Sequence, residues 1–230
     1  WWVGEAYNIS EIMEYYYMNK RKPRIGFTSS LTHFDIDNNN NGVDDFTHIV
    51  DFIKSTVNKY QWCFIGTFPK QLEKEVRDKK IEVYPGSDIL NFMRELKDKH
   101  FQCIVAPLID NVFNRGKSAI KLFECWALGI PIIAQDIITY NQYTDVVFKD
   151  SNDLQNWIDR IFKSPEVFKR MIKKNRHVVD FGNSKFPNGL WIEKNLQQWL
   201  NLFSMPQKTL KLLAKSQIKS TDNDNLIIEE

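Results

Sequence analysis

The sequence predicts an α/β fold, a Rossmann-like doubly wound parallel sheet that is followed by helices. Short apolar runs, typical of buried strands, alternate with segments of helical periodicity between residues 24 and 163. After residue 163 the pattern is helical only. Hydrophobic residues make up 43% of the 230 residues, enough for a sizeable core. Alternation of strands and helices is characteristic of a parallel sheet covered on both faces.

The elements follow from this pattern in order along the chain. The apolar runs predict strands over residues 24–28, 62–66, 81–84, 102–106, 131–134 and 146–148. The periodic segments predict helices over residues 44–60, 88–98 and 117–128, and another beginning near residues 151–153. Ser87 is the expected N-cap of the second of these helices.

Four segments are expected along the chain. They are a lead-in helix and linker over 1–23, the Rossmann-like domain over 24–163, closing helices over 164–203, and a tail over 204–230. The closing helices are predicted at 165–181 and 190–203, and the Lys- and Ser-rich tail is expected to be partly disordered. The chain starts at Trp1, without methionine, so we expect an excised part of a longer protein.

Composition argues against several classes of function. The 31 basic and 29 acidic residues nearly balance, which gives no basis for nucleic-acid binding. No apolar run approaches the roughly 20 residues of a membrane span. The three cysteines are scattered without a CxxC pair, and no His, Asp or Glu cluster has metal-ligand spacing. We therefore expect no metal and a reducing, cytoplasmic environment.

Ligands of doubly wound sheets bind beyond the carboxyl ends of the strands. Three segments lie there: the loop over 29–35, the Gly86-Ser87 turn and the loop over 111–117. The first carries Ser30, Thr32 and His33, although a single loop histidine is more often an exposed surface residue.

Lys117, Lys121 and Glu124 are spaced by four and three residues, which predicts one shared face of the helix over 117–128. A helix N-terminus already favours an anion. Two ammonium groups and one carboxylate suit a ligand with a diphosphate and a sugar diol. The alternative is an ordinary solvated face with an ion pair. A P-loop is disfavoured, because Asn111 stands where that motif needs its first glycine.

The pattern N-x-x-K-S-x-x-K-x-x-E, followed by A-L-G-I-P-I-I-A, resembles the donor-binding C-terminal half of GT-B glycosyltransferases. It begins at Asn114 and ends at Ala134. The resemblance is greatest to the retaining group 1 family, which builds bacterial surface polysaccharides. The upstream run R-I-G-F-T-S-S-L-T-H-F-D is similar to that family's G-S-x-T-H-x-x-D loop.

The resemblance implies roles for individual residues. Glu124 matches the second glutamate of the family's E-x7-E motif, which holds the ribose hydroxyls. Lys117 and Lys121 fall where basic residues lie near the diphosphate. The resemblance also implies donor binding by Asn114, Gly116, Ser118, Ser30, Thr32 and His33. Gly116 departs from the family, because the first glutamate of E-x7-E, which contacts the transferred sugar, would stand there.

The implied function is transfer of a sugar from a nucleotide-diphosphate sugar to a saccharide or lipid-linked acceptor, without metal or cofactor. Such an enzyme needs an N-terminal GT-B domain for its acceptor, so this chain alone should transfer little sugar. The basic run over 169–176 is expected to be the solvated side of an amphipathic helix, and peripheral contact with the inner face of the membrane is its alternative. Two alternatives stay open: a non-catalytic nucleotide-binding or scaffold module, which Gly116 favours, and a protein like the non-hydrolysing UDP-sugar epimerases, which share the fold.

Overall fold

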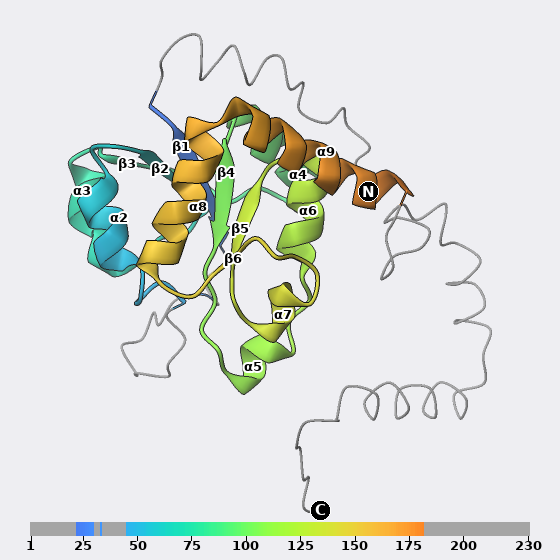
Figure 1. Cartoon of the computed structure of the whole chain (residues 1–230). Helices are drawn as coiled ribbons and strands as arrows, with labels where there is room; N and C mark the ends of the chain where they lie inside the picture. The colour runs from blue at the N-terminus through green and yellow to red at the C-terminus, as the bar shows by residue number, and fades with distance from the viewer. Residues whose placement is uncertain (1–21, 30–32, 34–44, 182–230) are drawn as a thin grey trace, which may run out of the picture.

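The computed structural model describes residues 22–29, 33 and 45–181, and it confirms the predicted Rossmann-like α/β fold (Figure 1). Six strands form one sheet in the order β3-β2-β1-β4-β5-β6, and every pair is parallel. The strands are β1 Arg24–Ser29, β2 Gln61–Gly66, β3 Ile81–Tyr84, β4 Cys103–Ala106, β5 Ile132–Gln135 and β6 Val147–Phe148. The order of the strands reverses between β1 and β4. Their carboxyl ends therefore form the switch point, at which sheets of this kind bind ligands.

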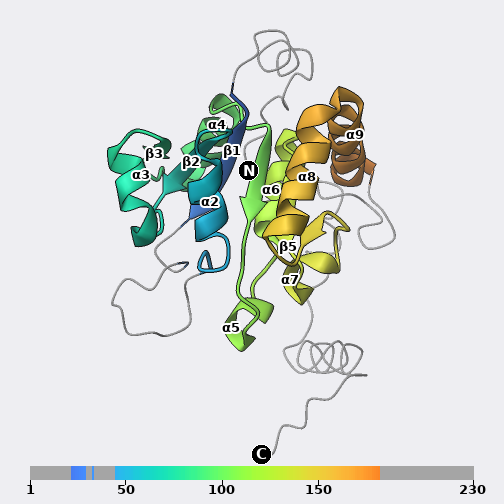
Figure 2. The same cartoon turned by 60° about the vertical axis from the view of Figure 1, so that its left-hand side comes forward.

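Helices cover both faces of this sheet (Figures 1 and 2). The described helices are α2 Val50–Thr56, η3 Lys70–Leu72, α3 Glu73–Arg77, α4 Ile89–Asp98, α5 Val112–Arg115, α6 Ile120–Leu128, α7 Ile138–Asn141, α8 Ser151–Lys163 and α9 Pro165–Phe181. α2 and α8 lie on one face, while α4 and α6 lie on the other. Every residue of β4 and β5 is buried, as expected for central strands packed on both sides.

The predicted helix over 44–60 is much shorter in the structure. α2 comprises only Val50–Thr56, and residues 45–49 form turns. The backbone N–H of Asp45 donates a hydrogen bond to the carbonyl of His33 at 3.1 Å, which fixes this segment outside the helix. A contact across twelve residues therefore overrides the local helical periodicity.

The predicted helix over 117–128 was wrong at its start. α6 begins at Ile120, and a separate short helix, α5, precedes it. Asn111 caps α5, because its side-chain oxygen accepts the N–H of Asn114 at 2.7 Å. Lys117 and Ser118 consequently lie in the segment between the two helices.

An aspartate caps the first turn of both α4 and α8. The carboxylate of Asp88, not the hydroxyl of Ser87, accepts the backbone N–H of Asn91 at 3.1 Å in the first turn of α4. Asp150 caps α8 by accepting the N–H groups of Asn152 and Asp153. In both helices the aspartate directly precedes the first helical residue, and this N-cap position favours aspartate.

The predicted closing helix over 165–181 is confirmed as α9, which packs against α6 and α8. The predicted helix over 190–203 and the tail lie outside the described residues. None of the described helices is long and apolar enough to cross a membrane.

Candidate functional site

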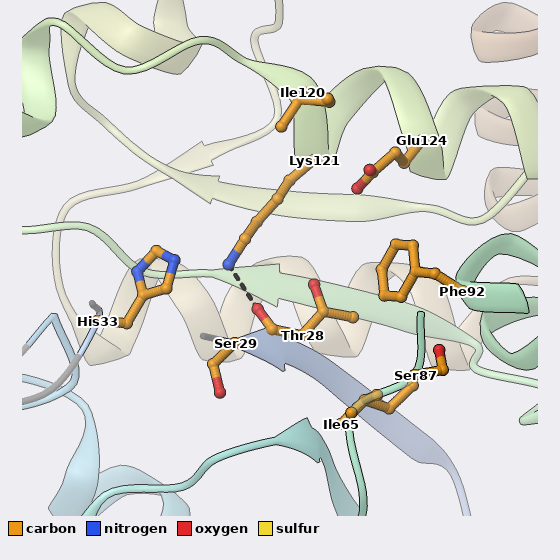
Figure 3. Close-up of a pocket in the computed structure, with 10 residues that line it drawn as sticks. Thr28, Ser29, His33, Ile65, Ser87, Phe92, Ile120, Lys121 and Glu124 are labelled. Carbon is orange, nitrogen blue, oxygen red and sulfur yellow. Dashed lines mark hydrogen bonds between the residues drawn. The ribbon is translucent and has the colours of Figure 1, made fainter. Parts of the chain in front are cut away.

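A pocket lies at the carboxyl ends of the strands on the β3–β1 side of the switch point (Figure 3). Its walls come from the ends of β1 and β2, the segment after β3, and helices α4 and α6. The lining residues are Thr28, Ser29, His33, Ile65, Gly86, Ser87, Phe92, Ile120, Lys121 and Glu124. His33, Lys121 and Glu124 were predicted as site residues, and the Gly86-Ser87 turn as a site segment. Thr28, Ile65, Phe92 and Ile120 were missed, although the first two stand at strand ends, where the rule for doubly wound sheets applies.

Lys121 reaches from the first turn of α6 across to the end of β1. Its ammonium donates a hydrogen bond to the carbonyl oxygen of Thr28 at 2.6 Å (Figure 3). The same Nζ atom lies 4.2 Å from the centre of the Phe27 ring, a cation–π contact. Burial lowers the pKa of Lys121 to about 8. The lysine therefore brings a poorly solvated positive charge to the pocket, where an anion would be favoured.

Glu124 stands nearly one turn further along α6 and lines the same pocket. Burial raises the pKa of its carboxyl to about 7, against the opposing effect of the Lys121 charge. A carboxyl in this position can accept hydrogen bonds from a ligand diol when ionised. The arrangement of Lys121 and Glu124 on one face of α6 is as the sequence predicted.

A fully buried aspartate, Asp45, links the loop after β1 to the loop after β4. Its Oδ1 accepts hydrogen bonds from the backbone N–H of Ile109 at 2.8 Å and from Nδ2 of Asn114 at 2.9 Å. Its Oδ2 lies 2.7 Å from Nδ1 of His33 and 4.0 Å from Nζ of Lys117. Sequence reasoning missed this residue, because its partners are all far along the chain.

His33 is buried beside this carboxylate and packs edge-on against Phe27. Burial lowers the pKa of His33, the charges of Lys121 and Lys117 lower it further, and the bond to Asp45 opposes them. The burial and the two lysine charges thus favour the neutral form of the imidazole. Figure 3 shows its ring at the same end of the pocket as the Lys121 ammonium.

Lys117 is not on the helical face that the sequence predicted, but it still reaches this cluster. Its Nζ lies 4.9 Å from the centre of the Phe113 ring, and burial lowers its pKa. The Nζ atom is buried, and no described residue accepts a hydrogen bond from it. His33 and Lys117 thus both lie against Asp45, and the charge of Lys121 acts on the same imidazole.

Four predicted site residues are described but are not among those that line the pocket: Lys117, Asn114, Gly116 and Ser118. Asn114 is fully buried, and besides its bond to Asp45 its Nδ2 donates to the carbonyl of Ile109. The backbone N–H groups of Gly116 and Lys117 donate to carbonyls of α5 at 3.2 Å, so both are already engaged. Ser30 and Thr32 lie outside the described residues.

Gly116 has an ordinary backbone conformation, with φ −84°. A Cβ there would lie 3.5 Å from the carbonyl oxygen of Phe113, an ordinary contact. Neither backbone strain nor crowding of a Cβ therefore requires glycine at this position. Among the described residues, no group of three or more His, Cys, Asp or Glu side chains is placed to hold a metal ion.

Two solved structures share this fold. HepE of Anabaena in complex with UDP and glucose aligns with a TM-score of 0.59 and 10% sequence identity, over 88% of this chain and 56% of that chain. HepE in complex with UDP-glucose aligns with a TM-score of 0.58 and 10% identity, over 88% and 57%. This chain thus spans little more than half the length of the HepE chains. No protein-family model matches the sequence, and no curated protein matches it.

Proposed function

We propose that this chain is the donor-binding half of a GT-B glycosyltransferase and that its pocket binds a nucleotide-diphosphate sugar. The observation that carries the proposal is that the buried Lys121 ammonium and the Glu124 carboxyl line the same pocket at the switch point. The likeness in fold to HepE, whose structures hold UDP with glucose and UDP-glucose, supports it.

Each part of the ligand has a counterpart in the pocket. Lys121 and His33 form the end suited to the diphosphate, where they would stabilise the negative charge that develops on the leaving group, and Lys117 would add its charge from beside Asp45, outside the pocket lining. Glu124 would accept hydrogen bonds from the ribose hydroxyls. Ile65 and Phe92 supply apolar surface for the flat nucleobase.

For the whole protein, we propose transfer of the sugar to a saccharide or lipid-linked acceptor, as in the group 1 family of surface-polysaccharide enzymes. Lysines would replace a metal in this reaction. An N-terminal GT-B domain would supply the acceptor site, and the chemistry would take place in the cytoplasm or at the inner face of the membrane. The described chain alone would bind the nucleotide but transfer little sugar.

Gly116 favours a second candidate, a non-catalytic nucleotide-binding or scaffold module. The site lacks the glutamate that would contact the transferred sugar, and the backbone has room for it. Sugar transfer by a protein that includes the N-terminal domain would exclude this candidate. Nucleotide binding alone is compatible with both.

Calorimetric titration of the chain with UDP, GDP and CMP tests the proposal. We expect at least one of the two nucleoside diphosphates to bind, and the Glu124→Ala variant to bind it at least tenfold more weakly, a loss of about 1.4 kcal/mol. Glu166→Ala, at the exposed start of α9, is the matched control and should bind as the wild type does. Absence of binding at millimolar concentration for all three nucleotides would refute the proposal.

A further inference from the structure

The bonding of Asp45 determines which nitrogen of His33 carries the hydrogen. Asp45 Oδ1 is occupied by two groups that can only donate, the N–H of Ile109 and the amide of Asn114. Asp45 Oδ2, 2.7 Å from Nδ1 of His33, is likewise an acceptor. The hydrogen in this contact therefore belongs to Nδ1, and Nε2 of the neutral ring carries a lone pair.

Charged groups face this imidazole from three segments. Asp45 precedes α2, Lys117 lies between α5 and α6, and Lys121 is on α6. In Figure 3 the His33 ring lies beside the Lys121 ammonium, which is directed to Thr28. Lys117 lies 4.0 Å from the same Asp45 oxygen that contacts His33. One carboxylate oxygen thus contacts the imidazole ring and also lies near the ammonium of Lys117.

We propose that Asp45 is a positioning residue, which holds the His33 ring so that Nε2 is presented to the diphosphate of the ligand. The identity of the ligand rests on the proposed function. A diphosphate oxygen has no hydrogen to donate to the Nε2 lone pair. Binding therefore draws one proton from solvent onto Nε2, and the imidazolium that forms is stabilised between Asp45 and the phosphate.

Two measurements on the wild-type protein test this directly. Long-range ¹H–¹⁵N correlation of histidine rings should show His33 as the Nδ1–H form in the free protein, and as the doubly protonated form with saturating UDP. His33→Gln identifies the signal among the four histidines. Titrations with UDP at about pH 7.5, in buffers that differ in ionisation enthalpy, should show net uptake of about one proton.

The Asp45→Asn variant keeps the shape of the side chain but presents an amide to His33. With its oxygen held by Ile109 and Asn114, its nitrogen can only donate, so the histidine should change to the Nε2–H form. We expect UDP to bind about tenfold more weakly and the proton uptake to disappear. Asp110→Asn, which removes an exposed carboxylate paired with Arg115, is the matched control and should change neither.

The outcomes separate this proposal from the proposed function. If Asp45→Asn binds UDP as the wild type does and the histidine form is unchanged, the positioning role is wrong. If the wild type binds no nucleotide, the proposed function fails, and the tautomer in the free protein still decides: an Nε2–H form in the wild type would overturn the role of Asp45. If Asp45→Asn does not fold, as circular dichroism would show, the wild-type tautomer and proton uptake decide.

Discussion

At the scale of single residues, the pocket holds ionisable groups that are removed from water. Lys121, Glu124 and His33 each have a pKa shifted towards the neutral form, with burial as the largest cause in every case. Such shifts cost stability, because the folded state disfavours the charge that each group carries in water. Clusters of this kind are common at functional sites. The shifts therefore give the site a measurable dependence on pH.

Glu124→Gln should change stability in a way that depends on pH. Because the folded protein binds the Glu124 proton more tightly, this carboxyl stabilises the fold fully below about pH 4.5 and loses that contribution as the pH rises through about 7. Glutamine carries no charge at any pH. The free energy of unfolding of the variant relative to wild type should thus rise by on the order of 2 kcal/mol between about pH 5 and pH 8.

Urea unfolding at the two pH values measures this difference. Glu166→Gln, an exposed carboxylate on α9, provides the control and should show a difference near zero between the two conditions. A relative stability of Glu124→Gln that falls with pH would contradict the raised pKa.

Lys117→Met should weaken nucleotide binding without weakening the fold. The ammonium is buried and makes no hydrogen bond to a described residue, so its removal costs only the long ion pair with Asp45 at 4.0 Å. Methionine keeps the apolar length of the side chain against Phe113. We expect UDP affinity to fall about tenfold, as for loss of a positive charge near the diphosphate, with the free energy of unfolding changed by less than about 1 kcal/mol.

Lys149→Met is the matched control for this prediction. Lys149 is an exposed lysine after β6, and its ammonium lies 3.8 Å from Asp136. Calorimetry should find its UDP affinity equal to that of the wild type. Equal loss of affinity in both variants would indicate a general effect of net charge, and would refute a specific role of the Lys117 charge.

At the scale of elements, the sequence predicted the strands well because their patterns are local. Ile104, Val105 and Ala106 form a continuous apolar run, and such a run is a buried parallel strand when helices flank it. The position of Lys117 could not be predicted in the same way. The α5 helix ends one residue after Asn114, whose side chain donates a hydrogen bond to Asp45, 69 residues earlier in the chain. No local pattern therefore indicates the interruption between α5 and α6.

The end of α6 supplies a prediction that contrasts two glycines. Gly129 ends the helix with φ 76°, a left-handed conformation, and a Cβ there would lie 3.2 Å from Cγ2 of Ile172 on α9. Gly129→Ala should therefore lower the free energy of unfolding by about 1–2 kcal/mol. Gly116→Ala, at φ −84° with only ordinary contacts for the added Cβ, should be neutral or stabilise by a few tenths to about 1 kcal/mol.

Thermal or urea unfolding of the two variants gives the comparison directly. Both changes add one methyl group at the end of a helix, so a difference between them reports backbone conformation and crowding. Equal effects of the two substitutions would show that the left-handed turn after α6 is not required for its packing against α9.

At the scale of the whole molecule, the site exists only because the sheet brings distant segments together. The parallel order β3-β2-β1-β4-β5-β6 places the ends of β1, β2 and β3 beside the start of α6. The rule for ligand binding at a switch point predicted, from the sequence, the edge of the sheet at which the pocket lies. The hydrogen bonds of Asp45 could not be predicted, because they depend on how the loops after β1 and β4 pack against each other.

A ligand in this pocket should protect three separate stretches of backbone from hydrogen exchange at once. With saturating UDP we expect slower exchange around Thr28 and His33, in the turn around Gly86 and Ser87, and at the start of α6, while α8 remains unchanged. Uridine, which lacks phosphate, should leave the start of α6 less protected at equal occupancy, because Lys121 has no anion to hold. Protection confined to the basic helix α9 would place the nucleotide on the surface and contradict the site at the switch point.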